Sequence, residues 1–394
     1  MADEMKSTAL SSVAQQGDFL HAASSSASLE AGQESRLTKA LLLAGGSGIR
    51  LRPLTQGRNK HMIPLANQPM IFYALAHLSR AGVREVGVVL GRCHDELTQA
   101  IGDGDRFGLE VTYVDQGDPR GLADAVRCGQ EFLGDDPFLM YLGDNLLQEG
   151  VAPLVDLYRR LRPDAVIAVT EVPEPSHYGV VELDAGRIVS IEEKPLQPRS
   201  NLALVGTYLF SPSVHEVIAH LEPSARGELE ITDALRILHR TGCKIAVHRL
   251  RGWWKDAGRP SDLLYANEEI LKMMPPEAFA HNGAIGPSGE SDGSVALGDG
   301  SAVSTHSRIC GPTVIGRDVQ IADGATVGSY CAIGDGCAVR AATVSRSILM
   351  EGAQVIGPLR VSDSVIGRNA RITARQPIHE PVSLTVGDSA SIEL

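Results

Sequence analysis

The C-terminal part of the chain repeats an aliphatic residue at every sixth position. Eight such residues follow one another without a break: Leu297, Val303, Ile309, Ile315, Ile321, Val327, Ile333 and Val339. A period of six predicts a parallel β-helix, because each aliphatic side chain fills the interior of a short strand and stacks on the coil below it. The register breaks after Val339 and returns in part in SVIGRNARI, so we expect irregular last coils.

The preceding region, residues 38–275, has a different pattern. Apolar, strand-like runs alternate with amphipathic segments: KALLLA, PMIFYALAHLSRAG, EVGVVLG, LADAVRCGQEFL, PFLMYLGDN and DAVIAVTEV. This alternation predicts an α/β domain with a mostly parallel sheet, whose ligands gather at the carboxyl ends of the strands. We therefore expect a domain over 38–275, a β-helix over 276–394, and a mobile tail over 1–37, where the low-complexity run AASSSAS occurs.

Charge and cysteine content exclude several classes of protein. The net charge of -12 and the pI near 5.5 argue against broad binding of nucleic acid or of an anionic membrane. No run of about 18 apolar residues is present that could span a bilayer. The six cysteines form no CxxC pair, which argues against a zinc ribbon and a disulfide framework and favours a reducing cytoplasm.

A glycine-rich loop with basic residues follows the first apolar run. Gly45, Gly46 and Gly48 precede Arg50, and Lys60 comes ten positions later. Glycines let backbone N–H groups approach a phosphate closely, and the basic side chains can pair with its oxygens. Neither GxxxxGK[ST] nor GxGxxG is present, so the alternative of a tight turn with solvated arginines stays open.

Several further motifs, taken together, resemble one enzyme family. They are LAGGSGIRLRPLT, NKHMIPLANQPMI, GLADAV, YLGDN, HYGVVELD, IEEKP, GELEITDAL and GWWKDAG. In this order, residues 39 to about 272 are similar to the sugar-1-phosphate nucleotidylyltransferases, most closely to the long-form glucose-1-phosphate thymidylyltransferases. The resemblance implies a Rossmann-like mixed sheet followed by a left-handed parallel β-helix. It also implies transfer of a nucleotidyl group from a nucleoside triphosphate to a sugar 1-phosphate, with release of pyrophosphate.

The resemblance assigns roles on the triphosphate side. Both reactants are anions, so positioning and electrostatics are expected to supply most of the catalysis. Arg50 would lie against the departing pyrophosphate, and Lys60 would neutralise charge on the incoming nucleotide. Asp144 and Asp256 would hold Mg²⁺, which takes one or two carboxylates together with phosphate oxygens and water. From the residues alone, a turn-forming or helix-capping role is favoured for each aspartate, since Asp-Asn and Asp-Ala-Gly are ordinary turn sequences.

The sugar 1-phosphate is expected to bind residues from the middle of the chain. By resemblance, Lys194 in IEEKP binds the phosphate, and Glu193 beside it accepts hydrogen bonds from sugar hydroxyls. Gly179 would let the backbone approach the hexose. Glu230 is assigned to the sugar as well, although it could be an ordinary helix residue, and EEKP could be an exposed charged turn.

Base recognition falls by resemblance on Gln116 and Gly121. A glutamine amide offers one acceptor and two donors, which suits the imide edge of thymine or uracil, although DQGDPRG could be a surface loop. His61 stands where the family usually has Gln, and Ile49 where a threonine is common; His61 could affect binding or only pack. These departures leave dTTP, UTP and a purine nucleotide open, and a modified sugar or a cyclitol phosphate could replace glucose 1-phosphate.

Two other classes of function compete with this enzyme. A regulatory subunit could keep the fold and lose catalysis, although the presence of Arg50, Lys60, Asp144, Lys194 and Asp256 argues against it. Hexapeptide β-helices also host acyltransferases, but the coils carry no candidate catalytic histidine with a matching acyl-donor site. We expect the β-helix to mediate homo-oligomer formation, and neither the number of subunits nor feedback control can be read from the sequence.

Overall fold

The computed structural model describes residues 37–279, 283–285, 290–292, 294–322 and 324–394. This chain divides into two compact units. We call residues 37–47 and 71–256 the α/β unit, and residues 48–70 and 257–394 the β-helix unit. Apart from Leu37, the predicted tail lies outside the described residues, and the predicted boundary between 275 and 276 stays a prediction.

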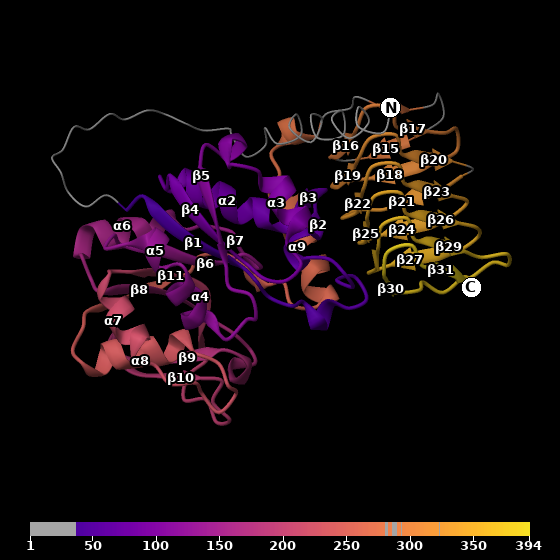
Figure 1. The fold of residues 1–394 in the computed structure, drawn as a ribbon. Helices are drawn as coiled ribbons and strands as arrows, with labels where there is room; N and C mark the ends of the chain where they lie inside the picture. The colour runs from indigo at the N-terminus through magenta and orange to yellow at the C-terminus, as the bar shows by residue number, and fades with distance from the viewer. Residues whose placement is uncertain (1–36, 280–282, 286–289, 293, 323) are drawn as a thin grey trace. The chain divides into compact units, whose positions relative to one another are not determined.

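A nine-stranded mixed sheet forms the centre of the α/β unit (Figure 1). Strands β6, β1, β4 and β5 are parallel neighbours in that order, whereas β11 is antiparallel to β6, β8 and β9. The strands of this sheet are β1 (Lys39–Ala44), β4 (Glu85–Leu90), β5 (Glu110–Asp115), β6 (Phe138–Leu142), β8 (Ala165–Glu171), β9 (Gly179–Asp184), β10 (Arg187–Glu193), β11 (Leu202–Phe210) and β12 (Ile245–Arg249). A separate two-stranded ladder pairs β7 (Asn145–Leu147) with β13 (Trp254–Asp256).

The expectation of a mostly parallel sheet holds for β6-β1-β4-β5 and for the pair β8-β12, and is wrong for β9, β10 and β11. A parallel neighbour requires a crossover of about a dozen residues. Here β9 and β10 instead form a hairpin through Ala185 and Gly186, at φ 46° and 79°, and β11 then enters the sheet in the direction opposite to β6. The mixed sheet implied by the resemblance is confirmed.

Both faces of the sheet are buried, which explains why KALLLA is a continuous apolar run. Leu41 and Leu43 share a core with helices α4, α7 and α8, while α6 packs against β8, β11 and β12. Ala40 and Leu42 alternate with Leu41 and Leu43, so they face the opposite side. The helices are α2 (Met70–Arg80), α3 (Asp95–Ile101), α4 (Leu122–Cys128), α5 (Gln130–Leu133), α6 (Ala152–Leu161), α7 (Ser213–Ala219) and α8 (Ile231–Arg240), with single 3₁₀ turns η4 (Asp105–Phe107) and η5 (Pro175–His177). Throughout the described ranges, no helix has the length and apolar run needed to cross a bilayer.

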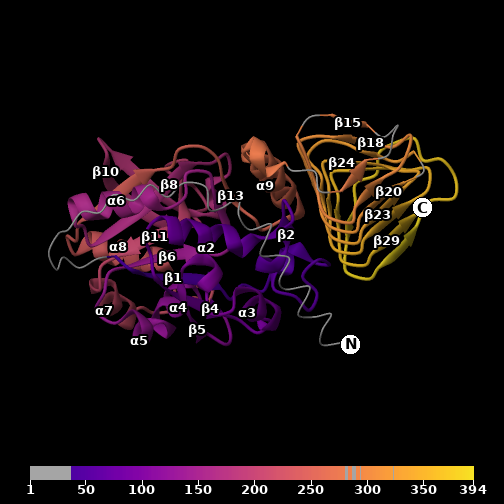
Figure 2. The ribbon, with the colours of Figure 1, turned by 90° about the horizontal axis from the view of Figure 1, so that it is seen from above.

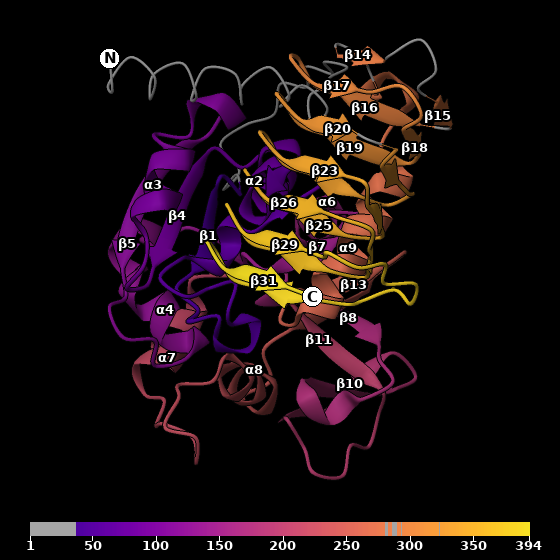
Figure 3. The same ribbon diagram turned by 90° about the vertical axis from the view of Figure 1, so that its right-hand side faces the viewer.

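Three parallel sheets build the coils of the β-helix unit, as Figure 2 shows down the stack and Figure 3 from the side. The first contains β14 (Ala284–Ile285), β17 (Ala302–Val303), β20 (Gln320–Ala322), β23 (Ala338–Arg340), β26 (Gln354–Ile356), β29 (Arg371–Thr373) and β31 (Ser391–Glu393). The second contains β15 (Glu290–Asp292), β18 (Arg308–Cys310), β21 (Thr326–Val327), β24 (Thr343–Ser345) and β27 (Arg360–Ser362). The third contains β16 (Val295–Leu297), β19 (Thr313–Ile315), β22 (Ala332–Ile333), β25 (Ile348–Leu349), β28 (Val365–Ile366) and β30 (Thr385–Val386).

The six-residue repeat correctly predicts the core of these coils. All eight aliphatic residues are at most 2% exposed and belong to one cluster. Three hexapeptides make one coil, so Ala302 pairs with Gln320 and Gln320 with Ala338, each 18 residues on. Beyond Val339 the spacing changes, since Ala338 pairs with Gln354 and Arg371 with Ser391, steps of 16 and 20 residues. The parallel β-helix and its irregular last coils are confirmed.

The β-helix unit also contains the segment that follows the glycine loop. This segment holds the 3₁₀ turns η2 (Ile49–Leu51) and η3 (Lys60–Met62) and the short hairpin β2 (Pro64–Leu65) and β3 (Gln68–Pro69), and helix α9 (Pro260–Met273) and the turn η6 (Pro276–Ala278) follow β13. Asn267 of α9 joins the hairpin to the coils, because it accepts from Ala66 N (2.8 Å) and donates to Tyr330 O (3.1 Å). Asn67 donates to Ile333 O at 2.8 Å. The segment 48–70 is therefore bonded to the coils on which it lies.

Candidate active site

The glycine loop after β1 owes its shape to close packing. A Cβ on Gly45 would lie 3.3 Å from Gln116 Oε1 and 3.5 Å from Gly91 N. Gly48 has φ 61°, and a Cβ there would lie 3.2 Å from Lys60 Cβ. Gly46, between them, is exposed. Gly45 and Gly48 have little room for side chains, and a loop that has no side chain at these positions is of the kind that lets an anion approach its backbone.

Arg50 and Lys60 belong to one turn of the β-helix unit. Thr55 closes this turn by donating from Oγ1 to Gly48 O at 2.8 Å. Arg50 Nη2 lies 2.9 Å from the position that a Cβ on the buried Gly258 would take, so the absence of a side chain at Gly258 makes room for the guanidinium. The two predicted phosphate-binding cations are thus carried by the same turn as Gly48.

His61 is buried beside Lys60. Its ring Nδ1 lies 2.6 Å from Asn59 Oδ1, which also accepts from His61 N at 2.9 Å and so caps η3. The ring is 1% exposed. Of the two roles considered for His61, this geometry supports packing: the ring stabilises the turn that carries Lys60.

Gln116 and Gly121 come together in the α/β unit, after the end of β5. Gln116 N donates to Leu90 O at 3.1 Å, and Gln116 Nε2 donates to Gly121 O at 3.2 Å. Gly121 has φ 109°, and a Cβ there would collide with Leu229 O. The predicted base-binding pair is therefore one hydrogen-bonded structure and not two separate positions in a surface loop.

Asp144 and Asp256 start from neighbouring positions of the β7-β13 ladder. Asn145, which follows Asp144, pairs in register with Asp256. The Asn145 amide donates from Nδ2 to Asp144 Oδ1 at 3.1 Å and accepts from Trp254 Nε1 at 2.7 Å. Neighbouring strands lie about 4.8 Å apart, so the backbones of the two aspartates are close enough for their carboxylates to reach one cation.

The residues predicted for the sugar 1-phosphate also lie together. Gly179 and Glu193 are partners across the β9-β10 hairpin, where a Cβ on Gly179 would lie 3.2 Å from Glu193 Oε2 and 2.9 Å from Leu204 Cδ1. Thr232 donates to the same Glu193 oxygen at 2.5 Å. Lys194 takes a positive φ of 43° and its Nζ lies 3.7 Å from Glu193 Oε1, so its ammonium group stays beside that carboxylate.

Arg226 completes this group, and the sequence analysis does not predict its role. Its Nη2 donates to Glu230 Oε1 at 2.7 Å and to Glu193 Oε1 at 3.2 Å, and Ser224 Oγ donates to Glu230 Oε1 at 2.9 Å. Glu230 is 4% exposed and immediately precedes α8. The signal that could have revealed Arg226 is the cation four residues before Glu230 in ARGELE.

The predicted residues therefore form two sets, each placed within its own unit. Gly48, Arg50 and Lys60 lie in the β-helix unit. The α/β unit contains all the others: Gly45, Gly46, Gln116, Gly121, Asp144, Gly179, Glu193, Lys194, Glu230 and Asp256. Asp124 and Asn145 hold members of the second set in place. They lie inside the motifs GLADAV and YLGDN, and the sequence analysis assigns neither of them a role.

Known proteins resemble the chain along most of its length. The nucleotidyl transferase family model matches residues 39–273. A glucose-1-phosphate thymidylyltransferase of Streptomyces griseus is 42% identical over 357 residues, which are 90% of this chain and 99% of that protein. The low-salt glycan biosynthesis nucleotidyltransferase Agl11 of Haloferax volcanii is 38% identical over 359 residues, 90% of this chain and 100% of the relative. Among solved structures, a UDP-glucose pyrophosphorylase complexed with UDP-glucose matches with a TM-score of 0.55 at 28% identity, covering 60% of this chain and 99% of that one.

Proposed function

The chain belongs to the nucleotidyl transferase family, and we propose that it transfers the thymidylyl group of dTTP to glucose 1-phosphate, giving dTDP-glucose and pyrophosphate. The observation that carries the proposal is the match to the Streptomyces griseus enzyme over 99% of that enzyme's length, which includes the β-helix as well as the α/β part. UTP is the second candidate nucleotide. It is favoured by the likeness to a UDP-glucose pyrophosphorylase and by the single methyl group that separates thymine from uracil, worth about 1–3 kcal/mol in a pocket.

The turn that carries Arg50 and Lys60 would bind the triphosphate. Backbone N–H groups at Gly45, Gly46 and Gly48 would face its oxygens, and the Arg50 guanidinium would stabilise the pyrophosphate as it leaves. The compact ammonium charge of Lys60 would neutralise negative charge on the phosphates of the incoming nucleotide. The packing of Gly48 against Lys60 keeps the backbone donors and the ammonium group on the same turn.

Asp144 and Asp256 would hold Mg²⁺. The donor set fits this ion, since proteins bind it through one or two carboxylates while phosphate oxygens and water complete its octahedron. When bound, the ion would neutralise charge on the phosphates and polarise the attacked phosphoryl group. The chain's own contribution is to hold the Asp144 carboxylate through the Asn145 amide, which Trp254 fixes in turn, and to place Asp256 by its backbone pairing with Asn145.

Glu193, Lys194, Glu230 and Gly179 would orient glucose 1-phosphate. The Lys194 ammonium would pair with the sugar's phosphate, and the carboxylates held by Arg226 and Thr232 would accept from hydroxyl groups. Because the second pKa of a phosphate monoester is about 6, the attacking oxygen is already ionised near pH 7 and no general base is needed. Catalysis then consists of aligning this oxygen with the α-phosphorus and stabilising charge in the transition state.

The test is pyrophosphate release by the purified full-length chain with Mg²⁺, glucose 1-phosphate and each of dTTP, UTP, GTP, ATP and CTP. We expect the highest kcat/KM with dTTP, and a loss of about 10²-fold or more in Asp144→Asn and in Asp256→Asn. Asp156→Asn, at an exposed position of α6, is the matched control and should keep full activity. If no nucleotide gave pyrophosphate release, with glucose 1-phosphate or with other sugar phosphates, a non-catalytic subunit would be favoured instead.

A homo-oligomer and a cytoplasmic location complete the proposal. The sparse cysteines support the cytoplasmic location, and the stack of coils in three parallel sheets supports the homo-oligomer. Light scattering on the full-length protein would give the number of subunits, and a monomer at micromolar concentration would contradict an oligomer.

A further inference from the structure

The side-chain amide of Gln116 is held in one orientation. Its nitrogen, Nε2, donates to Gly121 O at 3.2 Å and to Asp124 Oδ2 at 3.1 Å. A primary amide has two hydrogens, so both donors are used within the protein. The remaining atom, Oε1, lies on the Gly45 side, 3.3 Å from the position that a Cβ on Gly45 would take.

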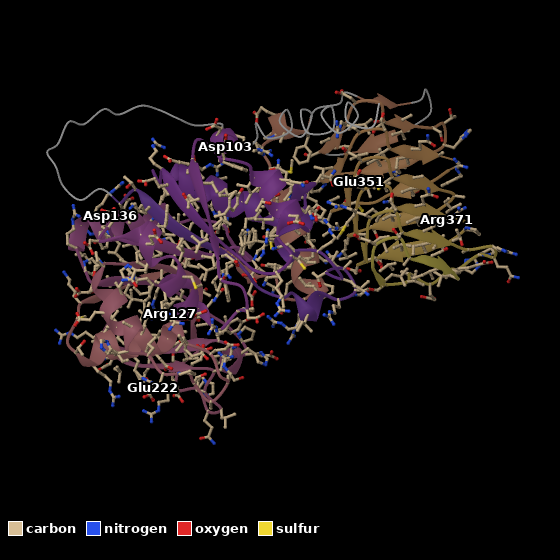
Figure 4. The ribbon with its side chains drawn as sticks, in the orientation of Figure 1. Asp103, Arg127, Asp136, Glu222, Glu351 and Arg371 are labelled. Atoms are coloured by element: carbon tan, nitrogen blue, oxygen red, sulfur yellow. The ribbon has the colours of Figure 1, made fainter. Side chains whose placement is uncertain are left out.

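Together with the backbone carbonyl of Gly121, Asp124 fixes this orientation. It lies on α4, is 1% exposed, and its second oxygen, Oδ1, accepts from Arg127 Nη2 at 2.5 Å (Figure 4 labels Arg127). An ionised carboxylate only accepts hydrogen bonds. If the Gln116 amide turned over, Oε1 would face two acceptors, Gly121 O and Asp124 Oδ2, with no hydrogen between them. The turned orientation is therefore excluded while Asp124 is ionised.

The orientation has a consequence for the bases that can bind. Thymine and uracil carry a hydrogen on N3 and guanine carries one on N1, so each can donate to an outward Oε1. Cytosine N3 and adenine N1 carry a lone pair, so a base seated as thymine is, with its ring nitrogen on Oε1, would meet it as acceptor against acceptor. Their exocyclic amino groups could donate to Oε1 only if the base shifted from that position. A site built to hydrogen-bond one group rejects analogues that cannot make the bond far more strongly than a pocket rejects a missing methyl group.

We propose that Asp124 is a positioning residue that determines base specificity. By holding Gln116 Oε1 outward, it makes the site accept nucleotides whose base has a ring N–H, which are those of thymine, uracil and guanine, and disfavour those of cytosine and adenine. This inference rests on the proposed function, because it requires the base to bind beside Gln116. It adds to that function the chemical rule for nucleotide choice and the residue that enforces it.

The wild-type protein gives the first test. With glucose 1-phosphate saturating, we expect kcat/KM for dTTP or UTP to exceed that for CTP by on the order of 10³-fold. Comparable use of dTTP and CTP, or of dTTP and ATP, would overturn the assignment and leave the proposed function intact. No rate with any nucleotide would defeat the proposed function, and the assignment with it. This test needs no variant, so it decides even if a substitution prevents folding.

Asp124→Asn gives the second test. The asparagine amide can donate as well as accept, so only Gly121 O still opposes the turned orientation, and Gln116 can present its nitrogen to the base more often than in the wild type. We expect the dTTP to CTP ratio of kcat/KM to fall at least tenfold, through a higher KM for dTTP and a lower KM for CTP. Cys128→Ser, one turn along the same helix and exposed, is the matched control and should keep the wild-type ratio. A merely structural role would weaken dTTP and CTP use equally, so an unchanged ratio in Asp124→Asn would overturn the proposal.

Discussion

At the scale of single residues, Gly121 is a position that tolerates no side chain. Its φ of 109° is unfavourable for an L residue, and Leu229, whose O would meet the new Cβ, is itself bonded to Arg120 O and Ala123 N. We expect Gly121→Ala to lower the free energy of unfolding of the α/β unit by about 2–4 kcal/mol and to raise KM for dTTP. Urea unfolding followed by tryptophan fluorescence reports on this unit, because both tryptophans, Trp253 and Trp254, lie in it.

Gly117 offers a matched control for this substitution. It also has a positive φ, 64°, but a Cβ there would meet nothing within 4 Å. Gly117→Ala should therefore cost only about 1 kcal/mol, the strain of the backbone conformation alone. Equal losses in the two variants would show that contact with Leu229 is not what excludes a side chain at Gly121.

His77 makes the stability of the α/β unit depend on pH. Burial, with a smaller contribution from Arg80, lowers the pKa of His77 from 6.5 to about 4, and its Nδ1 lies 3.1 Å from Tyr141 Oη. Between pH 6.5 and about 4 the unfolded chain binds a proton at this position that the folded chain does not, so stability falls as the pH falls through this window. At full extent the loss is about 3 kcal/mol.

We expect His77→Gln to remove this part of the pH dependence. The change in unfolding midpoint between pH 7 and pH 5 should be smaller in the variant than in the wild type, since glutamine can bond to Tyr141 without titrating. His220→Gln, at an exposed histidine of the same unit, should behave like the wild type. A wild-type pH dependence in His77→Gln would mean that another group is responsible.

At the scale of secondary-structure elements, the short β7-β13 ladder is what brings the two aspartates together. Trp254 secures it twice, by its 2.7 Å hydrogen bond to Asn145 Oδ1 and by an edge-to-face contact with Tyr178, whose ring centroid is 5.4 Å away. Trp254→Phe keeps the aromatic contact and removes the hydrogen bond. We expect the Mg²⁺ concentration for half-maximal activity to rise by about tenfold, as is usual when a partner of a metal ligand is lost.

Trp253→Phe is the control for this prediction. The bond between Trp253 N and Gln148 Oε1, at 3.0 Å, involves the backbone and survives the substitution. The Mg²⁺ concentration for half-maximal activity of Trp253→Phe should stay close to that of the wild type. If Trp254→Phe lowered activity at every Mg²⁺ concentration without shifting the midpoint, the ladder would not act through the metal.

The sequence predicts some of these elements better than others, for physical reasons. The aliphatic repeat predicts the β-helix core because only the inward residue of each step is constrained by packing. It cannot predict coils of 16 or 20 residues, since turns between strands can lose or gain residues while the core stays filled. The direction of β11 depends on the β9-β10 hairpin, and the pairing of Arg226 with Glu193 joins residues 33 apart, so neither follows from local pattern.

The candidate site was predictable to the extent that it lies in motifs. Motif resemblance predicts thirteen positions. They are divided between the two units, and hydrogen bonds such as Gln116 to Gly121 and Asn145 to Asp144 hold several of them. What sequence could not supply is orientation. That the Gln116 donors point inward is decided by Asp124, eight residues away, and that Asn145 joins Asp144 to Trp254 is decided by a contact across 109 residues.

At the scale of the whole molecule, each compact unit is built from stretches that are separate in the sequence. The turn with Arg50 and Lys60 belongs to the β-helix unit, where Arg58 Nη1 lies 3.4 Å from Asp388 Oδ2 in the last coils and 3.8 Å from Met350 Sδ. Pro53, on the same turn, would contact any Cβ placed on Gly387. The far end of the chain thus braces the turn that we propose binds the triphosphate.

Asp388→Asn tests this bracing. The substitution keeps the oxygen that accepts from Arg368 N at 2.8 Å and removes the charge that faces Arg58. We expect KM for the nucleotide to rise about twofold to fivefold, equivalent to the roughly 0.5–1 kcal/mol of a partly exposed pair, with KM for glucose 1-phosphate unchanged. Glu393→Gln breaks the pair with Arg375 at the same end of the coils and should change neither constant. Equal effects on both substrates would contradict a role confined to the turn.

The membership of residues 48–70 in the β-helix unit sets a rule for building hybrid enzymes. A chimaera joined at residue 275, which takes all later residues from a relative, would replace Asp388 while keeping its partner Arg58. It would also rely on the relative's backbone at positions 333 and 330 to accept from Asn67 and Asn267. Such a protein would have every motif, but the contacts between its earlier segments and its coils would join residues from two different proteins. A transplant that carries 48–70 and 257–394 together would move the whole set of contacts, so recombination between relatives should succeed with the three junctions 47/48, 70/71 and 256/257 where it fails with one.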